Sequence, residues 1–458
     1  MNTFDITTFG AIGDGRTLNT RALQQAGNAC REAGGGILRV PAGTYVTGVF
    51  ELFSNTTLLV EKEGRLLASP DLKDHLVGDT SVGLLYAQDA HDVTLTGEGT
   101  LDGNGSLFFH EDRVHGMQED FSGYDTWQNR HGLPYGTLDP SHGPLAPKER
   151  PGNMLIFARC KNLWIEKLFV TGAAYWTLHC SDSQDVTIEH LRIDHDLRHP
   201  NNDGIHVTTC QRVRIRHCQI SSGDDSIAIT GFREPAGERQ IAFGLRGLPG
   251  VCEDIEVSDC VLTSRSAGVR IGYGHNPVHR VKLSRLDIRE SNRGIGIFAR
   301  QADVEDVVIE DCRIDSALFH GNWWGRGDAI HLSAMRFPGD PTLHSIRHVT
   351  IRDIEAIGEN GINLIAEEPG FIHNVQLIRV KSTLRLGKLF PQWGGNLDNR
   401  PANHPYGIMA GGTAPYWAVG VSRLRCEDCE WMVEDAARAH FSTEPFVQFT
   451  LQTVLSVE

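Results

Sequence analysis

The feature that most constrains the fold is a repeated pattern of short strands along the middle of the chain. Most copies follow one another at 23 to 27 residues, and two longer steps, 213 to 255 and 307 to 349, contain insertions. Such a period is typical of a solenoid. Apolar residues alternate with a period of two inside each copy, so the units are strands. The sequence therefore predicts an all-β, right-handed parallel β-helix with copies that begin at Leu163, Val186, Val213, Ile255, Val281, Val307, Val349 and Val375.

The register of the repeat can be checked at the residue five positions after each start. This position is apolar or cysteine in every copy, which predicts that it faces the interior: Leu168, Leu191, Cys218, Cys260, Leu286, Cys312, Ile354 and Val380. Leucine-rich repeats share the period, but their leucine-rich consensus with asparagine is absent. Most of the ten cysteines are expected to be reduced core residues. Cys426 and Cys429 have CxxC spacing without a second pair, and Cys426 also occupies the inward position, so no metal site is predicted.

Two columns of equivalent positions should cross the coils. Asp203 and Asp225 each lie two residues before an apolar pair, so they should occupy equivalent places on adjacent coils. The full column reads Trp176, Asp203, Asp225, Ala267, Arg293, Asp328 and Asn360. The residue between the two apolar positions points outward, and that ladder reads His206, Ala228, Arg270, Gly296, His331 and Asn363. Together the columns predict a polar groove with aromatic edges on one face of the solenoid.

Three carboxyl groups fall in this predicted groove: Asp203, Asp224 and Asp225. Like charges in close proximity raise each other's pKa, so some of these groups should hold a proton near neutral pH. Cleavage of a glycosidic bond uses one protonated carboxyl as an acid and one ionised carboxyl as a base or nucleophile, and such a set could supply both. The alternative is that these aspartates only form turns, but stacked like charges without a use would cost stability.

The length and composition of the chain indicate how many domains it forms. A solenoid grows one coil at a time, and no linker-like or low-complexity tract divides the chain, so residues 1–458 are predicted to form one domain. Residues 1–60 should hold the N-terminal cap and first coils, with a capping helix from about Asn19 to Ala33. Loop insertions are expected at 108–150, 231–250 and 316–345.

The net charge of −15 argues against nucleic acid or an acidic membrane surface as a partner. No apolar run approaches the roughly 20 residues of a membrane span. The start, Met-Asn-Thr-Phe-Asp, has neither a basic region nor an apolar core. We therefore expect a cytoplasmic protein, or a secreted one if a leader has been omitted.

Several motifs in this order resemble the polygalacturonase family of glycoside hydrolases, family 28. They are FGAIGDG at 9–15, GGGILRVPAGTYVTG at 34–48, GEGTLDGNG at 97–105, NNDG at 201–204 and GDD at 223–225. The resemblance runs from about residue 5 to at least 300. It implies a right-handed parallel β-helix and hydrolysis with inversion at the anomeric carbon. It also implies that Asp224 is the general acid, while Asp203 and Asp225 activate water.

Two motifs of that family are replaced here. The expected Gly-His-Gly reads Ser266-Ala267-Gly268, and the expected Arg-Ile-Lys, which grips galacturonate carboxylates, reads Gly296-Ile297-Phe298. Arg270 and Arg293 lie in neighbouring positions and are candidate replacements, because arginine can bind a carboxylate bidentately; the alternative is ion pairing with nearby acids. The other candidate substrate-binding residues are Asn201, His206, Trp323, Trp324, Tyr273 and Trp176. The tryptophans and Tyr273 would stack on sugar rings, with core packing as the alternative.

The leading functional prediction is an inverting hydrolase of an acidic, pectin-derived oligosaccharide, with exo action and no cofactor. The 108–150 loop and the 321–327 turn should close one end of the groove. One alternative is a lyase-like β-eliminase that uses Ca²⁺. A second alternative is a β-helix that binds carbohydrate without catalysis.

Overall fold

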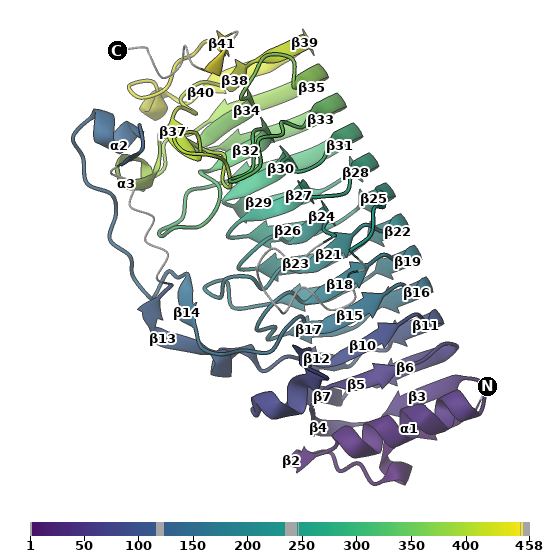
Figure 1. The fold of residues 1–458 in the computed structure, drawn as a ribbon. Helices are drawn as coiled ribbons and strands as arrows, with labels where there is room; N and C mark the ends of the chain where they lie inside the picture. Colours follow the sequence, from purple (N-terminus) through teal and green to yellow (C-terminus); the bar gives the residue numbers. More distant parts are fainter. Residues whose placement is uncertain (1, 116–122, 234–244, 246, 449, 452–458) are drawn as a thin grey trace.

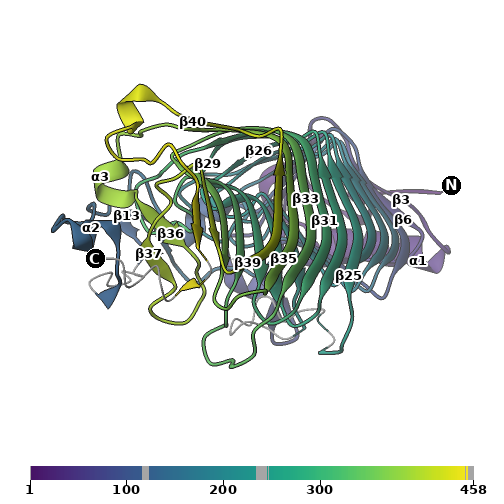
Figure 2. The same ribbon diagram turned by 90° about the horizontal axis from the view of Figure 1, so that it is seen from above.

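The chain winds into a long stack of coils, each of which contributes a strand to up to three parallel sheets (Figures 1 and 2). This is a computed structural model that describes residues 2–115, 123–233, 245, 247–448 and 450–451. The architecture is a right-handed parallel β-helix, as the repeat predicts. Interior side chains of successive coils stack into one continuous apolar core that extends from Ile6 to Val380. Burial of that core is the main force that holds the coils together.

The first two sheets lie next to each other around the coil. The first contains β1 (Thr3–Asp5), β3 (Gly36–Val40), β6 (Thr56–Val60), β11 (His91–Thr96), β16 (Lys161–Glu166), β19 (Gln184–Glu189), β22 (Gln211–Arg216), β25 (Cys252–Ser258), β28 (Val278–Ser284) and β39 (Val421–Glu427). The second contains β2 (Asp14–Leu18), β4 (Gly43–Thr47), β7 (Gly64–Ala68), β12 (Thr100–Asp102), β17 (Phe169–Thr171), β20 (Arg192–Asp194), β23 (Gln219–Ser222), β26 (Val261–Ser264), β29 (Asp287–Ser291) and β40 (Glu430–Val433). Three long strands run through both: β31 (Val304–Ser316), β33 (Ile346–Gly358) and β35 (Ile372–Leu384).

The third sheet carries the predicted groove on its outer side. Its strands are β5 (Phe50–Leu52), β10 (Leu85–Gln88), β15 (Leu155–Ala158), β18 (Leu178–Ser181), β21 (Ile205–Thr208), β24 (Ile227–Gly231), β27 (Ala267–Gly274), β30 (Arg293–Ala299), β32 (Asp328–Ala334), β34 (Asn360–Ala366), β38 (Tyr416–Val419) and β41 (Phe446–Gln448). The elements outside the three sheets are η1 (Ile6–Phe9), α1 (Thr20–Glu32), η2 (Leu72–His75), β8 (Leu76–Val77), β9 (Thr80–Ser81), η3 (Gly105–Phe108), β13 (Phe109–Val114), α2 (Trp127–Arg130), β14 (Leu145–Pro147), α3 (Phe390–Trp393), β36 (Asn396–Asp398), β37 (Ile408–Ala410) and η6 (Asp435–Ala437).

The predicted register is confirmed throughout the repeat. Each predicted start pairs with the next, from Leu163 with Val186 to Val349 with Val375. All eight residues at the predicted inward position are buried. The prediction for Cys426 is wrong, because Leu424 and not Val421 pairs with Val375, so Cys426 lies opposite Leu377 and is exposed. Within the part of the chain that the structure describes, its strand β39 pairs with β35 alone, so the other edge of β39 has no partner strand.

The first coil is covered by α1, close to the predicted helix. Its buried side, which includes Ala22, Leu23, Ala26 and Cys30, packs against β1, β3 and β5. No helix among the described residues is both long and apolar enough to cross a bilayer.

The three predicted loop insertions differ in how well they agree with the structure. The 108–150 stretch contains β13, α2 and β14, and it leaves the solenoid on the side where α3 also lies (Figure 1). Most of 231–250 lies outside the described residues. The prediction of a single loop at 316–345 is wrong, because β32 lies within it and divides it into loops at 317–327 and 335–345. The step from 307 to 349 is long because both loops are long, and the strand between them, β32, is retained.

Candidate functional site

A pocket of about 430 Å³ lies on the outer side of the third sheet, near the starts of β18, β21, β24 and β27. Loops from distant parts of the sequence form its other walls. The lining residues are His115, Pro144, Pro147, Arg150, Tyr175, Trp176, Pro200, Asn201, Asp203, Asp224, Asp225, Phe232, Ser266, Arg270, Tyr273, Asn322, Trp323 and Trp324.

The three predicted carboxyls meet in this pocket. Asp203 and Asp225 occupy equivalent places on adjacent coils, as the Gly204 amide, which donates to the Asp225 carbonyl at 2.9 Å, confirms. One oxygen from each of the three carboxyls lies within 4.8 Å of the others. This approach is closer than the roughly 6.5–9.5 Å that separates the carboxyls of a typical inverting glycosidase. The close approach strengthens the coupling between their charges.

Asp224 is held where it can keep a proton near neutral pH. Its Oδ2 accepts hydrogen bonds from the backbone amide of Asn201 at 3.2 Å and from the Asn201 carboxamide at 3.5 Å. Burial, followed by the charge of Asp225, raises the pKa of Asp224 to about 6. This is the behaviour of a carboxyl that can donate a proton.

Arg150 fixes Asn201 and therefore the environment of Asp224. It donates to the Asn201 side-chain oxygen at 2.8 Å and to the carbonyls of Ala174 and Pro200 at 3.0 and 3.1 Å. Asn201 itself has a left-handed backbone, with φ at 61°. Sequence reasoning missed Arg150, because it ends the 108–150 insertion and lies far from the repeat that positions the aspartates.

Arg270 joins the other two carboxyls. Its Nε pairs with Asp225, and its terminal nitrogen lies 3.8 Å from Asp203. The second Asp225 oxygen accepts the Ala267 amide at 3.1 Å. Burial and the charges of Asp224 and Asp225 raise the pKa of Asp203 well above its ordinary value. Among the described residues, Asp203 Oδ1 is buried and has no hydrogen-bond partner.

The spacing of the three aspartates would also admit a cation. The Arg270 guanidinium already supplies positive charge there, so it competes with a metal ion for the same oxygens.

His206 holds its predicted place in the outward ladder but does not line the pocket. It pairs in register with Ala228 and is covered by Trp176, whose ring centroid lies 3.6 Å from its own. Burial and the nearby Arg270 lower its pKa well below the usual value, so the imidazole is neutral. Its Nδ1 lies 3.5 Å from Asp203. The structure therefore makes His206 a support beneath Asp203 and Trp176, where the prediction made it a substrate ligand.

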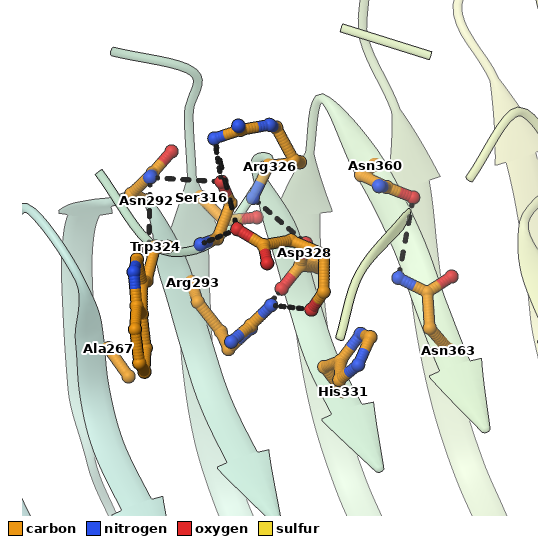
Figure 3. Close-up of polar contacts among 12 residues, drawn as sticks. Ala267, Asn292, Arg293, Ser316, Trp324, Arg326, Asp328, His331, Asn360 and Asn363 are labelled. Atoms are coloured by element: carbon orange, nitrogen blue, oxygen red, sulfur yellow. Dashed lines mark hydrogen bonds and ion pairs between the residues drawn. The ribbon is translucent and has the colours of Figure 1, made fainter. Parts of the chain in front are cut away.

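Arg293 also differs from its prediction. Its side chain is 3% exposed and pairs with the fully buried Asp328 (Figure 3). It also donates to the Asp398 carbonyl at 2.7 Å. The alternative of ion pairing therefore holds for Arg293, because a loop from residues 396–400 covers the coil position that the sequence left open.

The predicted aromatic residues do line the pocket. Trp324 is 37% exposed, whereas Trp323 is 4% exposed and serves as a wall. Trp176 is largely buried by its stack on His206, and Tyr273 packs edge-on against Phe232 at 5.3 Å. Tyr175 and Phe232 extend this aromatic lining and were not predicted, although Tyr175 immediately precedes Trp176 in the sequence.

Comparison with known proteins gives these features a family context. A family model described as "Glycosyl hydrolases family 28" matches residues 30–310, which include all three aspartates. The chain belongs to glycosyl hydrolase family 28. A probable polygalacturonase from Vitis vinifera is 28% identical over 310 residues, which cover 59% of this chain and 56% of the relative. An exopolygalacturonase from Zea mays is 25% identical over 283 residues, which cover 58% of this chain and 61% of the relative.

The chain spans about half the length of the curated relatives it matches. Among solved structures, an exopolygalacturonase from Thermotoga maritima superimposes with a TM-score of 0.63 at 22% identity. That alignment covers 87% of this chain and 89% of the other. The likeness shows that this family 28 chain shares the fold of that protein.

Proposed function

We propose that this family 28 protein hydrolyses glycosidic bonds in a uronic-acid-containing, pectin-derived oligosaccharide. The observation that carries the proposal is the convergence of Asp203, Asp224 and Asp225 in one pocket with different partners. Asp224 has neutral donors and a raised pKa, whereas Asp225 is paired with Arg270. Such different surroundings suit neighbouring carboxyls to different roles in the same reaction. The names of the curated relatives support a pectic substrate.

In the proposed reaction, Asp224 protonates the oxygen of the leaving sugar. Asp203 and Asp225 position a water molecule, and the water gives its proton to Asp225, which Arg270 contacts, as its oxygen attacks the anomeric carbon. The unpartnered Oδ1 of Asp203 offers an acceptor for that water. Both oxygens of Asp225 already accept hydrogen bonds, from Arg270 and from the Ala267 amide. This lowers their nucleophilicity and favours direct attack by water, with inversion, over a covalent intermediate.

Exo action is the second part of the proposal. Residues of both predicted end-forming segments line the pocket, including His115 and Trp324. His320, which directly precedes the 321–327 turn, also contacts the 108–150 segment, since its ring stacks on that of His142 at 4.3 Å. Such a wall would stop a sugar chain at its end and leave the terminal residue beside Asp224. The name of the maize relative supports the same mode.

The activity should depend on pH through Asp224. Its pKa is raised to about 6 by burial and by the charge of Asp225, so the acid holds its proton below that pH. We expect kcat/KM to fall about tenfold per pH unit above roughly pH 6. A pH–rate profile at low substrate concentration measures this limb for the free enzyme. Activity that stays constant to pH 8 would contradict Asp224 as the acid.

The deciding experiment is digestion of a panel of pectic oligosaccharides, with the first product followed by proton NMR. We expect release of terminal units, inversion of the anomeric configuration and no effect of a chelator. Initial retention would assign a nucleophilic role to one of the closely spaced aspartates. An unsaturated uronide product that disappears with a chelator would establish the β-eliminase. Binding without turnover of any oligosaccharide would favour the non-catalytic alternative.

A further inference from the structure

The described part of the interior holds a cluster of charges that the proposed reaction does not use. Its members are 6% exposed or less, and they comprise three arginines and two aspartates: Arg293, Arg326, Arg400, Asp328 and Asp398. Removing such charges from water costs several kcal/mol per ion unless their pairing is close to ideal. A cluster of this kind is therefore weak evidence for stability. We therefore looked for a role of this cluster that apolar side chains of similar size could not perform.

Asp398 is the centre of this cluster. Its carboxylate receives two bonds from the Arg400 guanidinium, at 2.9 and 2.7 Å, one from the Arg400 amide at 3.1 Å and one from the Gly325 amide at 2.9 Å. Arg326 lies 3.9 Å away. These cations hold the pKa of Asp398 far below its ordinary value despite its burial, with Arg400 the largest favourable influence. Asp398 is thus ionised over the whole range in which the protein would act.

The same groups hold the backbone of the turn that carries Trp324. Arg400 donates to the Trp323 carbonyl at 3.0 Å, and Arg326 donates to the carbonyls of Trp323 and Gly325 at 2.8 Å each. The Asn292 carboxamide completes the set, with bonds of 3.1 Å to the carbonyls of Trp324 and Gly325 (Figure 3).

Trp324 has the most exposed side chain of the 321–327 turn, in which Asn322 is half-buried and the other residues are buried. It is 37% exposed at the pocket, and the Arg400 guanidinium lies 5.8 Å from the centre of its ring. A tryptophan on a surface turn without such bonds would sample several rotamers, and ordering it would weaken ligand binding. The bonds described above hold the backbone from which the Trp324 side chain projects.

We propose that Asp398 is a positioning residue for substrate: through Gly325 and Arg400 it fixes Trp324 as a preformed stacking platform for a sugar ring. This inference rests on the proposed function, because it names the subsite that Trp324 serves. Asp398 does not line the pocket and acts only through its neighbours. Its effect should therefore fall on substrate binding, whereas the acid and base chemistry at Asp224 should be unchanged.

The test is Asp398→Asn, which keeps the size of the side chain and removes its charge. We expect KM for a pectic oligosaccharide to rise about tenfold while kcat changes less than twofold. In a Trp324→Ala background, the same change should leave KM unaltered, because the platform is already gone. Equal effects in both backgrounds would overturn the proposal, as would a fall in kcat with unchanged KM.

A second readout does not need turnover. In protein labelled with ¹⁵N-tryptophan, the Trp324 indole resonance can be assigned by its loss in Trp324→Phe. We expect Asp398→Asn to shift or broaden that resonance, and an unchanged resonance would overturn the proposal. If the wild type binds and cleaves no sugar, the proposed function fails, while this spectrum still decides whether Asp398 orders Trp324.

Asp102→Asn is the matched control. Asp102 is also a buried aspartate paired with an arginine, Arg65, but it lies in an N-terminal coil and does not line the pocket. We expect this variant to lower Tm without changing KM or the Trp324 resonance. A rise in KM equal to that of Asp398→Asn would reduce the effect to general destabilisation and overturn the proposal.

Discussion

Asp224→Asn should reduce kcat about 10²- to 10⁴-fold, the range typical of a lost general acid. The carboxamide keeps the shape of the side chain and can still meet the donors on Asn201, but it has no acidic proton to give to the leaving oxygen. Measurement of kcat and KM on the best pectic oligosaccharide checks this, and KM should change little. Asp196→Asn is a suitable control, because that aspartate is paired with Arg198 and does not line the pocket.

The stability of the same variant gives an independent check. The pKa of Asp224 in the folded protein, about 6, lies above its ordinary value of 3.8. The folded state therefore binds the proton more tightly, and ionisation of Asp224 destabilises the fold increasingly from about pH 4 to pH 6. We expect Asp224→Asn to have a Tm at pH 7 at least equal to that of the wild type. A large fall in Tm would mean that the aspartate is structural.

Arg270→Met should be the most destabilising single change near the pocket. It removes the cation that pairs with Asp225 and approaches Asp203, two carboxyls with 3% and 2% of their side chains exposed. Breaking a buried pair in this way typically costs about 3–5 kcal/mol. Activity should fall at least about 100-fold, because the carboxyls that position the water would lose the cation that holds them in place. Urea unfolding at pH 7 measures the first effect.

The double variant Arg270→Met/Asp225→Asn separates charge from packing. It removes both members of the pair, so we expect it to recover much of the lost unfolding free energy while remaining inactive. Equal stability of Arg270→Met and the wild type would contradict the role of Arg270 in holding the carboxyls. Loss of stability that the second substitution does not relieve would point to packing alone.

The coil register could be predicted from the sequence because it rests on local alternation. A shift of one residue would turn a whole strand inside out, so the pairing of Asp203 with Asp225 followed from their distance to the next apolar pair. The same reasoning placed Arg270 and Arg293 on neighbouring coils. Arg270 lines the pocket as expected, although its partners are the catalytic candidates.

The parts that sequence reasoning missed depend on chain segments far from the repeat. Arg293 was expected to be accessible because its column was predicted to line the groove, yet the segment around Asp398, more than 100 residues later, covers it. Arg150 reaches Asn201 from the end of a long insertion. Periodicity says which way a side chain leaves its coil, but it carries no information about which loop folds back over it.

Asp203 and the pair Asp224 and Asp225 are supplied by two coils that are neighbours both in sequence and in space. A solenoid can be extended at either end by duplication of a coil without disturbing the ones already present. An added coil between residues 203 and 225 would separate these groups by a further 4.8 Å or so. Coils at the two ends of the solenoid can therefore be added or lost during evolution, to suit longer or shorter sugars. A coil inserted between residues 203 and 225 would abolish activity.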